Sequence, residues 1–151
     1  MIPEAVTRSA LWLSLSWWVG SWGFFAFVVS RVAFRVLPGD VAGDLAGMLL
    51  AVLEWSGAGA ALIVAAAAAG LGRRGWHVWL PIFLALLCVA SELFLAPAVA
   101  AVRPSALGAA ATEISSRRFG LLHALSLGLF LGIHAFSIGL VVVHARLDAR
   151  T

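Results

Sequence analysis

Lysine is absent from this chain of 151 residues, cysteine occurs once, and charged residues make up only 11% of the sequence. Soluble domains carry about 25% charged residues. Together with 63% hydrophobic residues and a mean hydropathy of +1.05, this scarcity excludes an ordinary soluble protein and indicates an integral membrane protein. No polar stretch is long enough to form a second domain outside the bilayer, so we expect residues 1–151 to form a single domain.

The basic residues are all arginine, which keeps every positive charge permanent. They are spread over short hydrophilic segments, and no run or face concentrates them. This distribution is typical of anchors at a membrane interface and argues against nucleic acid as a partner. The lone cysteine, Cys88, lies inside an apolar run. It therefore forms no intrachain disulfide, and we interpret it as a small packing residue.

Four apolar stretches are long enough to cross the hydrocarbon core, which takes about 20 helical residues. They cover approximately residues 9–30, 45–71, 76–102 and 119–143. The first stretch exceeds the apolar region of a secretory signal peptide, about 7 to 15 residues, so we expect it to be retained. The predicted fold is all-α: a polytopic membrane protein with a bundle of four transmembrane helices.

An even number of spans places both termini on one side of the membrane, here called side A, and the loops after the first and third spans on side B. The arginines divide evenly between the two sides. Side A has Arg8, Arg73, Arg74, Arg146 and Arg150, and side B has Arg31, Arg35, Arg103, Arg117 and Arg118. The positive-inside rule therefore cannot orient the chain.

Small residues recur at spacings of three and four in the fourth span. In lipid, such residues let helices approach closely. The stripe comprises Gly120, Ala124, Gly128, Gly132, Ala135 and Gly139. We expect it to be a close-packing face, and we expect the protein to contact the lipid bilayer and to form a homo-oligomer through its glycine-rich faces.

Two acidic residues lie inside the predicted spans. Glu54 interrupts a series of small residues and should therefore face other helices, while Glu92 is followed by Pro97, which should kink the third span beside the acid. At a rise of about 1.5 Å per residue, Glu54 and Glu92 lie about 14 and 15 Å from side B. A charge near the bilayer centre costs at least about 2.5 to 3.5 kcal/mol, so the acids should be paired, protonated or bound to something.

Other polar side chains reach the same half of the membrane. His123 lies about 6 to 9 Å below side B, close to the arginines that flank the first and fourth spans. These residues form a candidate binding site: Glu54, Glu92, Arg31, Arg118, His123 and Ser126.

Three interpretations of this site stay open. In the first, the acids accept salt bridges or hydrogen bonds from the arginines or His123 and only hold the bundle together. In the second, Glu54, Glu92 and His123 bind a divalent metal ion or relay protons, since carboxylate and imidazole suit zinc, manganese or ferrous iron. In the third, arginines and tryptophans line an opening for an organic anion or an amphipathic molecule.

Two further functions, haem binding and enzymatic catalysis, can be judged from the residues that the sequence offers. His134 lies about 20° from His123 on one helical face, but haem ligation needs an axial partner on another helix. Outside the fourth span and its tail the chain offers only His77, so a haem could form only near His134 or His144, and we do not expect one. The sequence contains no glycine-rich phosphate loop and no hydrolase arrangement, so we do not expect an enzyme.

Three blocks resemble the signature blocks of a bacterial family of four-span membrane proteins of unknown function that is related to eukaryotic transmembrane protein 205. They read WWVGSWGFFAFVVSRVAFRVLPGDVAGDLAGMLL, ASELFLAPAVAAVRP and TEISSRRFGLLHALSLGLF. The resemblance covers nearly the whole chain and implies a four-helix membrane protein. Family positions that recur fall on Gly20, Phe25, Phe34, Pro97, Arg118 and His123. The eukaryotic relatives are linked to platinum-drug resistance and vesicle traffic.

The sequence therefore predicts a multi-pass protein of the inner (plasma) membrane that handles a small solute, a proton or a divalent ion. Its polar intramembrane cavity would be formed by Glu54, Glu92, Arg118 and His123. The alternative is a structural or accessory subunit whose buried polar residues only stabilise the bundle, and a haem-binding electron-transfer protein ranks below both. Beyond the divalent metal ion of the second interpretation, we expect no cofactor.

Overall fold

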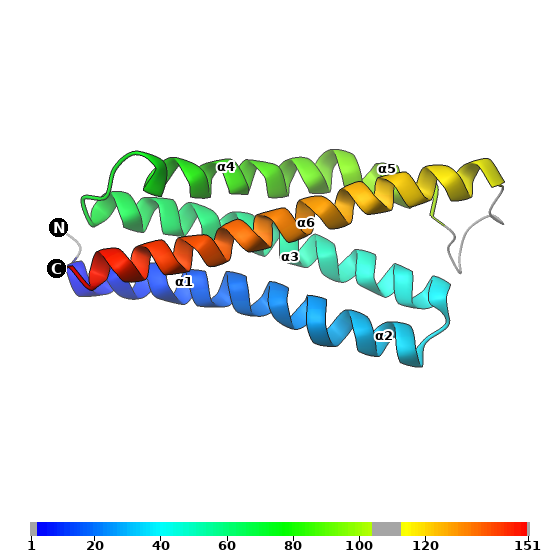
Figure 1. Ribbon diagram of the computed structural model, residues 1–151, viewed down its shortest axis with the longest axis horizontal. Helices are drawn as coiled ribbons and strands as arrows, with labels where there is room; N and C mark the ends of the chain where they lie inside the picture. Colours follow the sequence, from blue (N-terminus) through cyan, green and yellow to red (C-terminus); the bar gives the residue numbers. More distant parts are fainter. Residues whose placement is uncertain (1–2, 104–112, 151) are drawn as a thin grey trace.

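The computed structural model describes residues 3–103 and 113–150, and its four spans are long helices that run lengthwise through the molecule (Figure 1). All four are long and apolar enough to cross a membrane, so the predicted all-α bundle of four transmembrane helices is confirmed. The first span comprises α1 (Glu4–Phe24), the π-helical segment η1 (Phe25–Val29) and α2 (Ser30–Val36); the second is α3 (Gly39–Gly70); the third comprises α4 (Trp76–Ala90), the π-helical segment η2 (Ser91–Leu95) and α5 (Ala96–Ala100); and the fourth is α6 (Glu113–Asp148).

The helices extend beyond most of the predicted apolar boundaries. The first span continues through Arg31 and Arg35 because arginine is a good helix former, so its charge marks the membrane boundary without ending the helix. The helix ends at Leu37, whose backbone is extended (φ −106°, ψ 153°). Leu37 precedes Pro38, and a proline disfavours the helical conformation of the residue before it. Hydropathy thus locates the part of each helix that lies in lipid, and turn residues decide where the helix stops.

A tight turn joins α3 to α4 at side A. Gly72 and Gly75 adopt φ values of +72° and +68°, in the left-handed region that glycine enters without a steric penalty. The turn is fixed by backbone hydrogen bonds, among them one from the Arg73 amide to the Ala68 carbonyl at 3.0 Å. Arg73 is therefore held at the bundle end, where α6 also finishes.

The core is built around two tryptophans of α1. Trp18 and Trp22 are fully buried, so they pack between helices and do not face lipid. They lie against Gly57 of α3, where an added Cβ would be 3.0 Å from Trp18 Nε1 and 3.2 Å from the Trp22 ring. Trp22 Nε1 donates a hydrogen bond to the Leu53 carbonyl at 3.2 Å. A glycine at position 57 is what lets the two helices approach across the indole rings.

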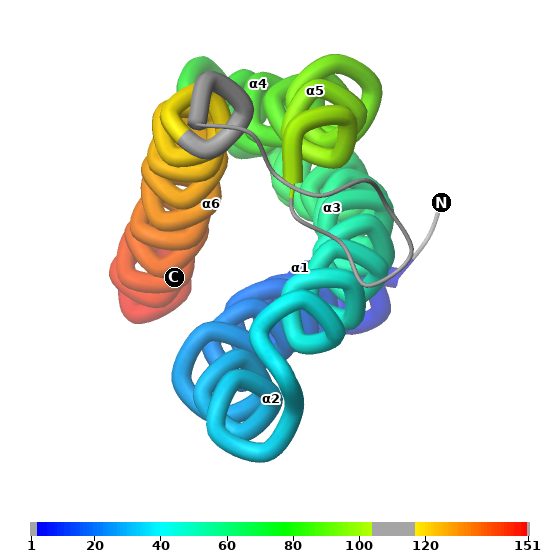
Figure 2. The backbone as a smooth tube through the Cα atoms, turned by 90° about the vertical axis from the view of Figure 1, so that its right-hand side faces the viewer, coloured from blue at the N-terminus to red at the C-terminus, as the bar shows by residue number. Residues whose placement is uncertain are grey.

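Helix α6 crosses the bundle obliquely. It lies beside α1 near its end and beside α5 near its start, and α1 begins at the same end of the bundle where α6 finishes (Figures 1 and 2). The predicted small-residue stripe faces away from the rest of the chain, because nothing lies within 4 Å of a Cβ built on its four glycines. The stripe therefore does not pack against another helix of this chain. The buried face of α6 is a different one: Phe130, Ile133, His134, Ser137, Leu140 and His144.

The helical geometry of the third span changes where Pro97 was expected to disturb it. A proline has no backbone N–H to donate and its ring crowds the preceding turn. Residues Ser91–Leu95, which end two positions before Pro97, form a π-helical segment instead of an α-helical turn. Glu92 lies inside this segment, so the disturbance predicted beside the acid is present as a π turn. Such turns are frequent at functional sites.

Candidate functional site

Glu54 is the most deeply buried of the predicted site residues. Its side chain belongs to α3, is 5% exposed, and lies beside the Cys88 thiol and the Ser91 hydroxyl of the third span. The Oε2 atom of Glu54 has no hydrogen-bond partner among the described residues. The prediction that Glu54 faces other helices is confirmed, and Cys88 is a fully buried core residue that also contacts the acid.

Glu92 approaches Glu54 from the neighbouring span. It is half-buried and close enough for its charge to act on Glu54. Two like charges in a medium of low dielectric repel each other strongly. We call Glu54 and Glu92 the acid pair. A buried carboxylate without a counter-charge is costly, so Glu54 needs a proton or a cation to be stable there.

The remaining predicted site residues lie apart from the acid pair. His123 is exposed, and its ring stacks on Phe119 with centroids 5.4 Å apart. Arg31 and Arg118 are exposed and Ser126 is half-buried. The ion pairs of the described residues do not include either acid of the pair: they join Arg8 to Glu4, Arg8 to Asp148, Arg73 to Asp148, and Arg103 to Asp44.

The expected counter-charges are absent from the acid pair for two physical reasons. An arginine at the side B boundary would have to carry its charge about 14 Å into the bilayer to reach Glu54, whereas at the interface its head stays hydrated. His123 lies outside the buried face of α6, since residues 117–129 include no fully buried residue. The first interpretation, in which Arg31, Arg118 or His123 neutralises the acids, is therefore not supported by the ion pairs of the described residues.

The three-ligand metal site is also not formed. Within residues 3–103 and 113–150, no group of three histidine, cysteine, aspartate or glutamate side chains is placed to hold a metal ion. Protein metal sites usually draw on three or more ligands. Glu54 and Glu92 lack His123 as their third ligand because that ring is on the exposed face of α6.

A second polar cluster, which the sequence did not indicate, lies at side A. Asp148 accepts a hydrogen bond from Trp12 Nε1 at 2.8 Å, forms an ion pair with Arg73, and lies 3.9 Å from Arg8 Nε. These contacts join α1, the α3–α4 turn and the end of α6. The sequence pattern indicated these contacts only weakly. The arginines of side A were used only in the count for the positive-inside rule, although His144 and Asp148 lie four residues apart on one helical face.

Two histidines complete this side A cluster. His144 is fully buried; its Nδ1 atom contacts the Arg73 guanidinium, and its Nε2 atom has no partner. His77 faces it with ring centroids 6.1 Å apart, and the buried Nδ1 of His77 also has no partner in the described structure. We define the side A cluster by six residues: Arg8, Trp12, Arg73, His77, His144 and Asp148.

His134 lies midway along the buried face of α6. Phe130 stacks on Trp22 with centroids 4.5 Å apart and an interplanar angle of 1°, and His134 continues the stack with its centroid 6.4 Å from that of Phe130. A Cβ on Gly23 would lie 3.7 Å from His134 Nε2. The ring is thus packed among aromatic side chains, while its Nδ1 atom is buried without a partner.

At side B, Arg103 connects the end of the third span to the start of α3. Its guanidinium donates to the Gly43 carbonyl at 2.7 Å and to Asp44 at 2.5 Å. A Cβ at Gly47 would lie 2.6 Å from Nη1 of Arg103. The glycines at the start of the second span therefore accommodate an arginine side chain.

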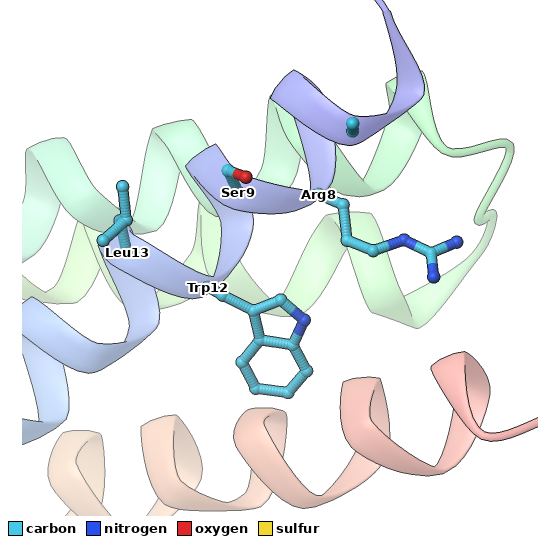
Figure 3. Close-up of a pocket in the computed structure, with 5 residues that line it drawn as sticks. Arg8, Ser9, Trp12 and Leu13 are labelled. Atoms are coloured by element: carbon cyan, nitrogen blue, oxygen red, sulfur yellow. The ribbon is translucent and has the colours of Figure 1, made fainter.

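Two pockets of the described structure lie on its outer surface. One of about 520 Å³ is lined by residues of α1, and in Figure 3 the Trp12 ring points toward α6, while the Arg8 side chain extends away from Ser9. Another, of about 380 Å³, lies between α1 and α3. Neither pocket includes Glu54 or Glu92. Glu54 is instead enclosed by packed side chains, among them those of Cys88 and Ser91.

Comparison with known proteins identifies a family. Residues 13–106 match the family described as "Domain of unknown function (DUF4149)", a match that includes the acid pair. No curated protein matches the chain, and no solved structure matches it.

Proposed function

Since this chain belongs to the DUF4149 family and is an integral membrane protein with four apolar helices, we propose that it handles a proton or a small cation at the acid pair. The observation that supports this is the Glu54 carboxyl, which is buried within a span and has an oxygen atom without a partner. Acidic residues inside membrane spans are costly and usually mark ion or proton pathways.

The chemistry of the acid pair narrows the choice of ligand. Two carboxyl groups repel anions, so the site opposes the organic anion of the third interpretation. A divalent metal ion is disfavoured because the described residues supply no third ligand. A proton needs only hydrogen-bonding groups, and Glu54 has the Cys88 thiol and the Ser91 hydroxyl beside it. The acid pair therefore suits a proton best, and a small monovalent cation next.

This proposal describes an ion-handling protein of the plasma membrane, not an enzyme. The alternative is a structural subunit in which Glu54 is permanently protonated and serves only as a packing residue. A relation to transmembrane protein 205 is also proposed, and it rests on the three sequence blocks given above.

Replacement of Glu54 tests the proposal. In proteoliposomes that contain a pH-sensitive dye and an imposed proton gradient, we expect Glu54→Gln to lower the proton flux by about 100-fold or more, since glutamine keeps the shape of the side chain but cannot exchange the proton. The matched control is Glu4→Gln, at an exposed acid of side A. Its flux should equal that of the unmodified protein.

Two results would contradict the proposal. One is equal flux in Glu54→Gln and the unmodified protein. The other is an unmodified protein whose flux of protons and of monovalent cations equals that of empty liposomes, which would favour the structural alternative. Thermal unfolding in detergent shows whether a variant that has lost flux is still folded. We expect Glu54→Gln to be at least as stable as the unmodified protein, because it removes a buried titratable group.

We also propose that the outward glycine stripe of α6 mediates self-association. Substitution of Gly128 and Gly132 by leucine should lower the cross-linked dimer fraction in lipid, because small residues allow close helix contact. The free energy of unfolding should not fall, since nothing lies within 4 Å of either position and leucine is a better helix former than glycine. Gly59→Leu, at an outward position of α3, is the control. An unchanged dimer fraction would reject the stripe as an interface.

A further inference from the structure

Buried polar atoms without partners are distributed along the length of the described bundle. They lie at side A, in the middle of the membrane and at side B: His77 Nδ1 and His144 Nε2; then Trp18 Nε1, His134 Nδ1 and Glu54 Oε2; then Arg103 Nε. Buried polar groups in proteins nearly always bond to protein atoms or to ordered water. These atoms therefore mark the positions at which the interior can hold water between helices.

The hydrogen bonding of His144 fixes its protonation. A guanidinium has only N–H donors, so His144 Nδ1 must be the acceptor in its contact with Arg73, and the ring proton lies on Nε2. A second proton on His144 would remove this acceptor and place two positive charges together. Asp148 does not compensate, because it already pairs with Arg73 and accepts a hydrogen bond from Trp12. His144 is therefore a neutral imidazole with a fixed Nε2–H donor.

The Nε2–H of His144 excludes a metal ion or a haem iron as its partner and favours an oxygen acceptor. A ring nitrogen that carries a proton has no lone pair for a metal ion or a haem iron, so His144 is not placed to ligate either. It needs an oxygen acceptor instead. His77 faces it, with ring centroids 6.1 Å apart, and the buried Nδ1 of His77 is also without a partner. A separation of this size suits one water molecule that accepts from His144 and bonds to His77.

The polar groups continue inward from this pair along one helical face. His134 lies on the same buried face of α6 as His144, about 15 Å farther into the membrane. Its ring stacks beside Trp22, whose indole donates to the carbonyl of Leu53, the residue before Glu54. His134 thus lies between the side A cluster and the level of the acid pair.

We propose that the ion handled at the acid pair is a proton and that it reaches Glu54 from side A through His77 and His144. This inference rests on the proposed function. His77 accepts a proton on one ring nitrogen and releases the proton held by the other, so the imidazole is regenerated after each transfer. His144 stays neutral and uses its Nε2–H to hold the water that receives the proton. Glu54 accepts the proton as a carboxylate, which becomes a carboxylic acid, and is a carboxylate again after it releases the proton.

Two substitutions test this route in the full-length protein reconstituted in liposomes. His144→Asn keeps an acceptor near the position of Nδ1 for Arg73 but removes the Nε2–H donor, and His77→Gln removes the titratable ring. Each should lower the proton flux by about tenfold or more, while the infrared band of the protonated Glu54 carboxyl, identified by its loss in Glu54→Gln, remains and exchanges more slowly with D₂O. His123→Asn, at an exposed histidine of the same helix, should leave both measurements unchanged.

The outcomes separate the two proposals. Unmodified flux in His77→Gln and His144→Asn, with no flux in Glu54→Gln, would overturn the side A route and leave the acid pair in place. Unmodified flux in all three variants would overturn the proposed function as well. If thermal unfolding shows that His144→Asn does not fold, His77→Gln alone decides, because in the described structure His77 contacts the rings of Trp76 and His144 and takes no part in the ion pairs of the side A cluster.

Discussion

Replacement of Gly57 by valine is expected to lower the free energy of unfolding by about 3 kcal/mol, because extra atoms in a close-packed core force side chains and backbone to move. A single Cβ at this position would already lie 3.0 Å from Trp18 Nε1 and 3.2 Å from the Trp22 ring. Neither indole has room to retreat, since both are fully buried and Trp22 is stacked on Phe130. Tryptophan fluorescence during denaturation in detergent measures the effect directly.

The same helix supplies the control for this experiment. Gly59 lies two residues farther along α3, and nothing is within 4 Å of a Cβ built there. Gly59→Val carries the same change in helix propensity, so the difference between the two variants isolates the contact with the indoles. Equal stability of Gly57→Val and Gly59→Val would show that α3 does not pack on Trp18 and Trp22 as described.

Replacement of Asp148 by asparagine should lower the free energy of unfolding by about 3 kcal/mol, because loss of one partner from a largely buried ion pair leaves the other charge uncompensated. Asp148 forms an ion pair with Arg73, whose side chain is only 10% exposed. Asp148 also accepts a hydrogen bond from Trp12 Nε1. These contacts attach the end of α6 to α1 and to the α3–α4 turn. Thermal unfolding reports the stability, and amide hydrogen exchange of residues 140–148 should quicken.

A second ion pair of side A provides the comparison. Arg8 and Glu4 form a pair at 2.6 Å on the surface of α1, with side chains 37% and 71% exposed. Exposed pairs contribute about 0 to 1 kcal/mol, so Glu4→Gln should be close to the unmodified protein. A loss in Asp148→Asn no greater than that in Glu4→Gln would mean that the end of α6 is held by apolar packing alone.

Hydropathy was sufficient to predict the number and order of the spans, because the energetic cost of exposing the backbone to lipid leaves few alternatives to helices. The inward direction of Glu54 and the disturbed helix before Pro97 could also be predicted, since each follows from the local cost of a buried acid or a missing N–H. The face that α6 presents could not be predicted. Its stripe of small residues suggested inward packing, but the tryptophans of α1 and the oblique path of α6 bury the face with His134 and His144 instead.

The partners of the polar residues depended on tertiary structure that local patterns do not contain. Glu54 lies beside Cys88 and Ser91, small residues that carry no signal of their own. The side A cluster forms because the glycine turn presents Arg73 to the last turns of α6, a separation of more than 70 residues along the chain. Depth alone suggested that His123 and the side B arginines would reach the acids, but side chains at the interface are more stable when hydrated.

The π turns of the first and third spans also determine how the bundle responds to a change in chain length. A π hydrogen bond reaches one residue farther than an α-helical one, so each of these turns holds one additional residue. Loss of a residue within 25–29 or 91–95 can be absorbed by return to a regular α-helix, whereas the same loss in α3 would rotate Glu54 away from Cys88. Glu92 lies in the segment where this one-residue shift is available. Whether the two acids face each other therefore depends on a single hydrogen-bond register of the third span.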